Sequence, residues 1–242
     1  MKPLVLLAPS EEKASGGHTG RLMENPAQKW VREKLIELVV HGGPEAWAKA
    51  FAVKNGALAK ACQEALALRH PVPLAAALER YQGVAFVALD AASLPRATWR
   101  QVFILSNLRG LVRGDEPVPP YKLKLGGIPG LKAYWRKHLG PSLASIPKGP
   151  LWELLPEEHS ELLKDWARPR HTLEITNEEG KSVSHFSKLY RGRVARWLLL
   201  HGQGAPAKVI EAKIEGCSWA GIEENSTGGT MMRLVVLQGA RP

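Results

Sequence analysis

Short, predominantly apolar segments alternate along the chain with segments in which apolar residues recur every three or four positions. The segments LVLLA (Leu4–Ala8), QVFILS (Gln101–Ser106) and LVVL (Leu234–Leu237) have the length and content of buried strands. Because helical patterns lie between them, a helical bundle and a β-sandwich are both disfavoured. The sequence therefore predicts an α/β (mixed α+β) fold, with a mixed sheet flanked by helices.

The clearest helix start is Asn25-Pro26, an N-cap residue followed by proline at the first helical position. Gly42-Gly43 ends this helix. The other expected elements are helices from Pro44, over Ala57–Leu68, in PVPLAAALERYQG, after Pro129 and Pro156, over Lys188–Leu200 and after Pro206, a strand-like Val84–Leu89, and a hairpin of HTLEIT and KSVSHF. With 242 residues and no long linker, residues 1–242 are predicted to form one compact domain.

Positive charge is concentrated in two blocks. From Arg100 to Gly149 there are nine Lys and Arg residues and two acidic residues, a net charge of +7. From Lys181 to Lys213 there are seven Lys and Arg residues and one acidic residue, a net charge of +6. The intervening Leu151–Gly180 has eight acids and three bases, a net of −5. The overall excess of +10 attracts polyanions. If the basic blocks share one face, the chain folds back on itself.

The most informative motif is VSHFSKLYRGRVARWLL, residues 183–199. On a helix, Lys188, Arg191 and Arg196 fall on one side and apolar residues on the other. Such a cationic face suits phosphate groups, since arginine offers a planar fork and lysine a point charge. The alternative is a solvated helix face anchored by Trp197.

Three further segments have the residues for a ligand site. The loop after the strand that ends at Ser106 contains Arg109, Arg113, Tyr121, Lys122 and Lys124. The loop after the first strand contains Ser10 and Lys13, and with Ser106 it forms a possible pocket, because α/β proteins place ligand sites at strand ends. The turn Lys54-Asn55-Gly56 joins two helical patterns and can offer backbone amides to a phosphate. Each segment also has a purely structural interpretation. The first would be a structural loop, the second a plain connection and the third a helical packing unit.

Several classes of protein are disfavoured. Cys62 and Cys217 lack any CxxC or Cys/His spacing, so no disulfide framework and no metal site is expected, and we expect no cofactor. The apolar segments are too short for a signal peptide or a membrane span, so we expect a cytoplasmic protein without a membrane partner.

The order of motifs resembles the YaaA peroxide-stress-response family over nearly the whole chain. The resemblance rests on LVLLAPSEEK, ALERYQGVAFVAL, VFILSNLRGLVRGDEPVPPYKLKLGG and SHFSKLYRGRVARWLL, whereas LWELLPEEH at Leu151–His159 departs from the family pattern. It implies a single-domain fold with a positively charged cleft and a helix-hairpin-helix element, for which Lys54-Asn55-Gly56 is the counterpart. It also implies binding of duplex and distorted DNA, such as bubbles or junctions, and a role in oxidative stress and DNA repair.

Three hypotheses follow. In the first, the protein binds DNA without sequence specificity, cations of the two basic blocks contact phosphates, and Tyr121 or Tyr81 stacks on an unpaired base. In the second, it is an enzyme acting on a nucleotide or damaged base, with a deep pocket that holds Lys13 and Lys188 together and a lysine nucleophile. In the third, the charge only serves solubility. The first is favoured, with DNA as the partner and a monomer as the expected state.

Overall fold

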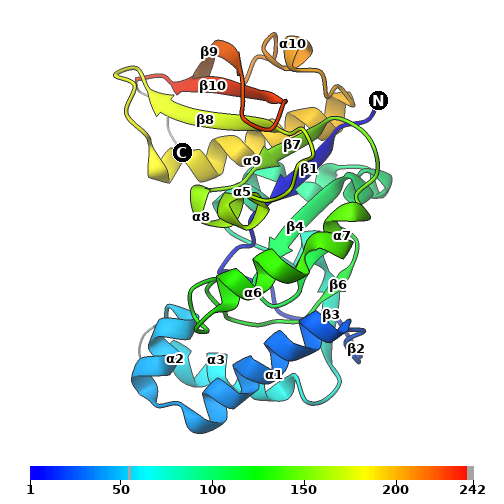
Figure 1. Cartoon of the computed structure of the whole chain (residues 1–242), viewed down its shortest axis with the longest axis vertical. Helices are drawn as coiled ribbons and strands as arrows, with labels where there is room; N and C mark the ends of the chain where they lie inside the picture. Colours follow the sequence, from blue (N-terminus) through cyan, green and yellow to red (C-terminus); the bar gives the residue numbers. More distant parts are fainter. Residues whose placement is uncertain (54–55, 239–242) are drawn as a thin grey trace.

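The structure is a computed structural model that describes residues 1–53 and 56–238 (Figure 1). Its main sheet has seven strands, in the order β5 (Gly110–Arg113), β4 (Val102–Ser106), β1 (Leu4–Leu7), β7 (Leu151–Leu154), β8 (His171–Asn177), β10 (Thr230–Val236) and β9 (Cys217–Glu224). A small antiparallel sheet contains β2 (His18–Gly20), β3 (Val72–Ala76) and β6 (Pro117–Val118).

The five central strands of the main sheet, β4, β1, β7, β8 and β10, are parallel. The strands β5 and β9 add an antiparallel neighbour at each edge. All four residues of β1 are buried, as expected for a parallel strand covered on both faces. The carboxyl ends of the parallel strands therefore share one edge, the place where α/β proteins build ligand sites.

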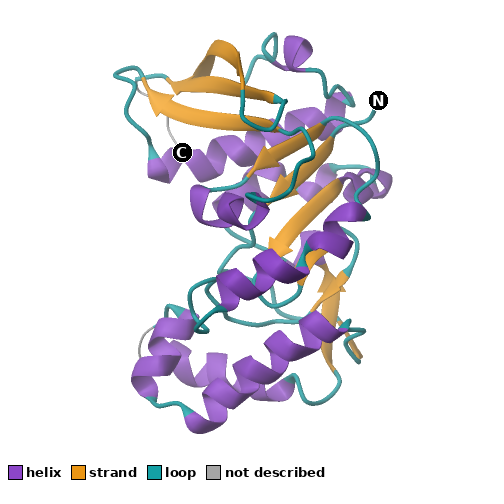
Figure 2. Cartoon of the chain, viewed as in Figure 1, coloured by secondary structure: helices purple, strands orange, loops and turns teal. Residues whose placement is uncertain are grey.

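Ten α-helices are formed by the described residues: α1 (Pro26–His41), α2 (Pro44–Phe51), α3 (Gly56–Ala67), α4 (Ala77–Arg80), α5 (Val84–Leu89), α6 (Leu131–His138), α7 (Gly140–Ala144), α8 (Glu157–Ser160), α9 (Ser184–His201) and α10 (Pro206–Val209). Helices α1, α2 and α3 gather at one end of the molecule, away from β8, β9 and β10 (Figure 2). Helices α6 and α7 lie in front of the central strands in Figure 1. A mixed sheet flanked by helices confirms the predicted fold class. None of these helices has the length and apolar content needed to cross a membrane.

The first helix begins where the sequence predicts. The Asn25 side chain accepts a hydrogen bond from the Gln28 backbone N–H at 2.9 Å, and the Gln28 side chain accepts one from the Asn25 N–H at 3.1 Å. This reciprocal capping box satisfies amides that would otherwise lack partners at the helix start. The helix ends at His41, before Gly42.

Three predicted elements are wrong. Val84–Leu89 is the helix α5 rather than a strand, and it packs against α9. Its sequence was misread because a short apolar run is compatible with either a strand or a buried helix. Val72–Ala76, expected in a helix, is the strand β3. The expected hairpin partner of β8 makes only one bridge, Thr176 to Ser182, before α9 begins; β8 pairs instead with β7 and β10.

Close packing of α5 and α9 depends on Gly192. A Cβ atom built there would lie 2.2 Å from the carbonyl oxygen of Ala85 and 2.7 Å from the Ala88 Cβ. We expect Gly192→Ala to lower the free energy of unfolding by about 1–3 kcal/mol, because the overpacked backbone must move apart. Chemical denaturation measures this change. The control Gly140→Ala, with nothing within 4 Å of its added Cβ, should not destabilise; equal losses in both variants would contradict the explanation.

Candidate functional site

The loop that follows β1 is fixed at the carboxyl edge by pairing with the chain around Tyr81. Lys13 forms an antiparallel bridge with Tyr81. The N–H of Gln82 donates to the carbonyl of Glu12 at 2.9 Å, and the N–H of Ala14 donates to the carbonyl of Arg80 at 2.8 Å. This pairing places Lys13 beside the Tyr81 ring.

Arg80 contacts the same loop through hydrogen bonds, and its side chain is completely buried. Its guanidinium donates to the carbonyls of Gly16 at 2.8 Å, Pro73 at 3.1 Å and Val118 at 3.1 Å, and also to that of Ala14. One side chain thus joins the loop to β3 and β6, two strands of the small sheet. Sequence reasoning missed this residue, whose only signal is its place directly before Tyr81.

The amino group of Lys13 lies among aromatic rings and has few polar partners. Its Nζ donates to the carbonyl of Ser10 at 2.7 Å and stands 4.0 Å from the ring centroid of Tyr121 and 5.2 Å from that of Tyr81. No carboxylate among the described residues is within ion-pair distance of this Nζ. The ammonium form therefore lacks the charge partner that buried lysines normally have.

Burial and the nearby charge of Lys122 together lower the pKa of Lys13 from 10.5 to about 7, while Glu64 and Glu11 oppose the shift. Desolvation disfavours the charged form of an amine, and a like charge has the same effect. Around neutral pH a large fraction of this amine is consequently unprotonated.

A chain of buried hydroxyls lies at the same place. The hydroxyl of Tyr121 is 2.9 Å from that of Tyr81 and 2.9 Å from the Ser106 Oγ, which accepts from the N–H of Arg109 at 3.1 Å. Burial raises the pKa of both tyrosines. Each tyrosine is only 1% exposed, so neither ring offers a face to a base, which corrects the expected stacking role of Tyr121 and Tyr81.

The loop with Lys122 and Lys124 joins this site to the helical pair α2–α3. The Nζ of Lys122 donates to the carbonyl of Glu11 at 2.6 Å, and the backbone N–H of Lys124 donates to the carbonyl of Ala50 at 2.8 Å. The Lys124 side chain is exposed and Lys122 is half-buried. The structure thus brings Ser10, Lys13, Ser106 and Lys122 close to one another, and their role in a ligand site stays a prediction.

The start of α9 approaches the same edge through α5. Gly192 packs against Ala85, and Arg196, one turn later, donates to the carbonyls of Leu89 and Asp90 at the end of α5, so the two helices run parallel. Lys188 precedes Gly192 by one turn on the same helix face. By this spacing it lies about one turn before the start of α5. There Gly83 meets the N-terminal loop, since a Cβ added to Gly83 would lie 2.6 Å from the Ser10 Oγ.

Four predicted phosphate-binding arginines have partners inside the protein. Arg109 is 7% exposed, and its guanidinium donates to the carbonyls of Pro117 and Met23. Arg113 pairs with Asp115, and Arg196 pairs with Asp90 and also donates to the Ser93 Oγ at 2.8 Å. Arg191 donates to the Ser187 Oγ at 2.9 Å, and burial lowers its pKa. The burial of Arg109 argues against its predicted contact with phosphate, whereas the predicted phosphate contacts of Arg113, Arg191 and Arg196 stay predictions.

Two other expectations have different outcomes. Lys54 and Asn55 lie outside the described residues and Gly56 begins α3, so the helix-hairpin-helix element stays a prediction.

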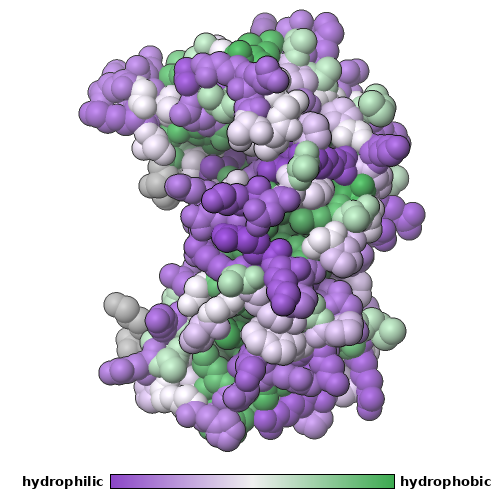
Figure 3. Space-filling model, in the orientation of Figure 1, coloured by the Kyte–Doolittle hydropathy of each residue, from purple (hydrophilic) through white to green (hydrophobic). Residues whose placement is uncertain are grey.

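Hollows of about 320 and 300 Å³ lie against α1 and beside the ends of β8 and β10, and neither is lined by Lys13 or Lys188. In the space-filling view, the molecule narrows at mid-height, and hydrophilic side chains gather along the concave left edge between the parts that contain α9 and α2 (Figure 3).

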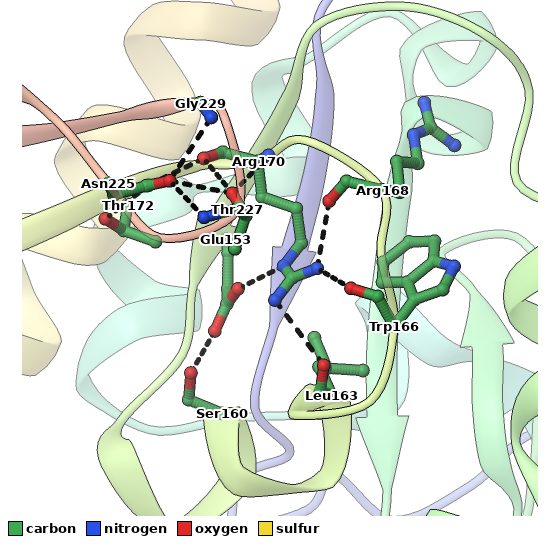
Figure 4. A network of polar contacts seen from close by, with 10 residues as sticks. All are labelled: Glu153, Ser160, Leu163, Trp166, Arg168, Arg170, Thr172, Asn225, Thr227 and Gly229. Carbon is green, nitrogen blue, oxygen red and sulfur yellow. Dashed lines mark hydrogen bonds and ion pairs between the residues drawn. The ribbon is translucent and has the colours of Figure 1, made fainter.

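A buried ion pair near β7 was also missed. Arg170 donates through Nε to a Glu153 carboxylate oxygen at 2.7 Å, and the side chains are 6% and 3% exposed (Figure 4). The other carboxylate oxygen accepts from the Ser160 hydroxyl, and the guanidinium also donates to the carbonyls of Trp166 and Arg168. In the sequence these residues belong to the block with a net charge of −5, and no pattern there predicts that they are buried and paired.

The two cysteines do not have the properties of peroxide-reactive thiols. Burial raises the pKa of the Cys217 thiol from 9.0 to about 11 and raises that of Cys62 as well. The thiolate is the form that peroxide oxidises, and both groups are protonated at neutral pH.

The fold and this edge define a mixed α/β protein in which a half-buried lysine, a hydroxyl chain and a second lysine, Lys122, lie close together near the ends of parallel strands. The chain belongs to the YaaA peroxide stress protein family, whose family model matches residues 3–221. A UPF0246 protein of Streptomyces coelicolor is 31% identical over 86% of this chain and 88% of its own length. A UPF0246 protein of Corynebacterium efficiens is 29% identical over 96% of this chain and 100% of its own length, and one of Corynebacterium glutamicum is 32% identical over 68% and 71%.

Proposed function

We propose that this protein binds DNA in the response to peroxide stress and contacts the sugar-phosphate backbone through Lys122, Lys124 and Lys188. One observation supports the proposal: the Lys122 Nζ meets the loop after β1 at the Glu11 carbonyl, at 2.6 Å, and α9 with the exposed Lys188 packs against α5, which follows Tyr81. The link to peroxide stress comes from the family.

The three lysines are suited to phosphate because they are available. No carboxylate among the described residues is within ion-pair distance of their amino groups, in contrast to Arg113 and Arg196. Lys122 is held by a backbone carbonyl, which leaves its charge uncompensated. Lysine acts as a point charge and does not read base edges, so this surface favours binding that is independent of sequence. Duplexes, bubbles and junctions all offer such backbones.

Fluorescence anisotropy with a labelled duplex tests the proposal. We expect Lys122→Gln combined with Lys188→Gln to weaken binding by roughly tenfold or more, because a charge-assisted hydrogen bond contributes about 1.5–3 kcal/mol. The matched control is Lys208→Gln, on α10, where the lysine pairs with Glu211. Equal affinity of the double variant and the wild type would contradict the proposal, provided both are folded by circular dichroism.

A further inference from the structure

Lys13 is the group at this edge that phosphate binding does not use. It is half-buried, so part of its surface remains open to solvent. The described contacts of its amino group are one hydrogen bond to a carbonyl oxygen and a position over the Tyr121 ring. Neither contact occupies the nitrogen lone pair of a neutral amine, because a carbonyl oxygen accepts a hydrogen and a ring face attracts the N–H side.

Burial and the neighbouring cation Lys122 keep a large fraction of this amine neutral near pH 7, against the weaker opposing influence of Glu11 and Glu64. Arg80, which also faces the loop, acts in the same direction as Lys122. A desolvated lysine next to another cation is the arrangement that activates an amine for attack on carbonyl carbon.

We propose that Lys13 is a nucleophile that forms an imine with an aldehyde, and that the aldehyde is the ring-opened sugar of an abasic site in DNA. This inference rests on the proposed DNA binding, because Lys122 and Lys188 would place the damaged strand beside Lys13. An abasic site is a form of DNA whose sugar offers an aldehyde.

The chemistry balances without an oxidant or reductant. The Lys13 nitrogen attacks the aldehyde carbon, and one of its protons moves to the carbonyl oxygen to give a carbinolamine. The carbinolamine hydroxyl then leaves with the second nitrogen proton as water, and a carbon–nitrogen double bond remains. The overall change is amine plus aldehyde to imine plus water, and it is reversible.

Borohydride trapping tests the inference. The protein is incubated with a duplex containing a single abasic site, and borohydride reduces any imine to a stable secondary amine. We expect a covalent complex with wild-type protein, its loss in Lys13→Arg, and its retention in Lys29→Arg, an exposed lysine on α1 that pairs with Glu33. In the wild type, mass spectrometry should find the adduct within the tryptic peptide Met1–Arg21, with fragment ions on Lys13 rather than on the α-amino group.

Two parallel measurements separate the possible failures. Anisotropy with the same abasic duplex reports binding, so tight binding without a trapped complex would overturn this inference and leave the proposed function standing. Failure to bind any duplex would overturn both. Trapping of free 2-deoxyribose 5-phosphate but not of abasic DNA would overturn the assignment of the aldehyde to DNA. An adduct mapped to a different lysine would overturn the role of Lys13.

Discussion

Glu153→Gln should lower the free energy of unfolding by about 3–5 kcal/mol, because it leaves the buried charge of Arg170 without a carboxylate. The guanidinium would keep its bonds to backbone carbonyls, yet these do not neutralise it. The loss should be visible as an earlier midpoint in urea with little change in the slope of the transition.

The control for this variant is Glu174→Gln, which removes the carboxylate of an exposed pair with Arg233 at a similar distance of 2.6 Å. Exposed pairs contribute about 0–1 kcal/mol, since water screens them. Similar losses for the two variants would mean that burial does not set the strength of the Glu153–Arg170 contact.

The second large effect is a loss of stability in acid caused by His159. Its Nε2 lies 3.0 Å from the Asn107 Oδ1, and since the Asn107 amide nitrogen donates to the Leu123 carbonyl at 2.9 Å, Nε2 carries the hydrogen. The Nδ1 atom is buried and has no hydrogen-bond partner among the described residues. A proton there would have no acceptor, and burial lowers the pKa of His159 from 6.5 to about 4.

Between pH 6.5 and 4 the unfolded chain binds a proton at His159 that the folded chain does not. The free energy of unfolding should therefore fall as the pH falls, by about 3 kcal/mol at pH 4 relative to pH 7 from this group. Denaturation of the wild type and His159→Gln across this range isolates the effect, because the glutamine amide can still donate to Asn107 and does not titrate. A constant stability difference between the two proteins would contradict it.

The alternation of apolar and amphipathic segments sufficed to predict the fold class, and Asn25-Pro26 located the start of α1. Predictions failed where tertiary contacts decide between states. Val84–Leu89 has the composition of a strand, but it forms the helix α5, which packs closely against Gly192, more than 100 residues away in the sequence.

The candidate site shows a similar division. Loops after β1 and β4 could be predicted to meet, because the ends of parallel strands share an edge. Which cations remain exposed could not be predicted. Arg109 and Lys124 are equally basic in the sequence. Only in the folded protein do the carbonyls of Met23 and Pro117 come close enough to accept hydrogen bonds from the buried Arg109 guanidinium. Arg80 was missed for the same reason, since its four carbonyl partners come from three separate stretches of chain.

The salt dependence of duplex binding tests the central claim most directly. Each phosphate neutralised by a cation contributes a slope of about −0.9 to a plot of log affinity against log salt concentration, so three lysine contacts predict a slope of roughly −3 or steeper. In the variant with Lys122→Gln and Lys188→Gln, the slope should become shallower by nearly 2. A flat plot for the wild-type protein, or an identical slope in the variant, would contradict the assignment of these lysines to the DNA backbone.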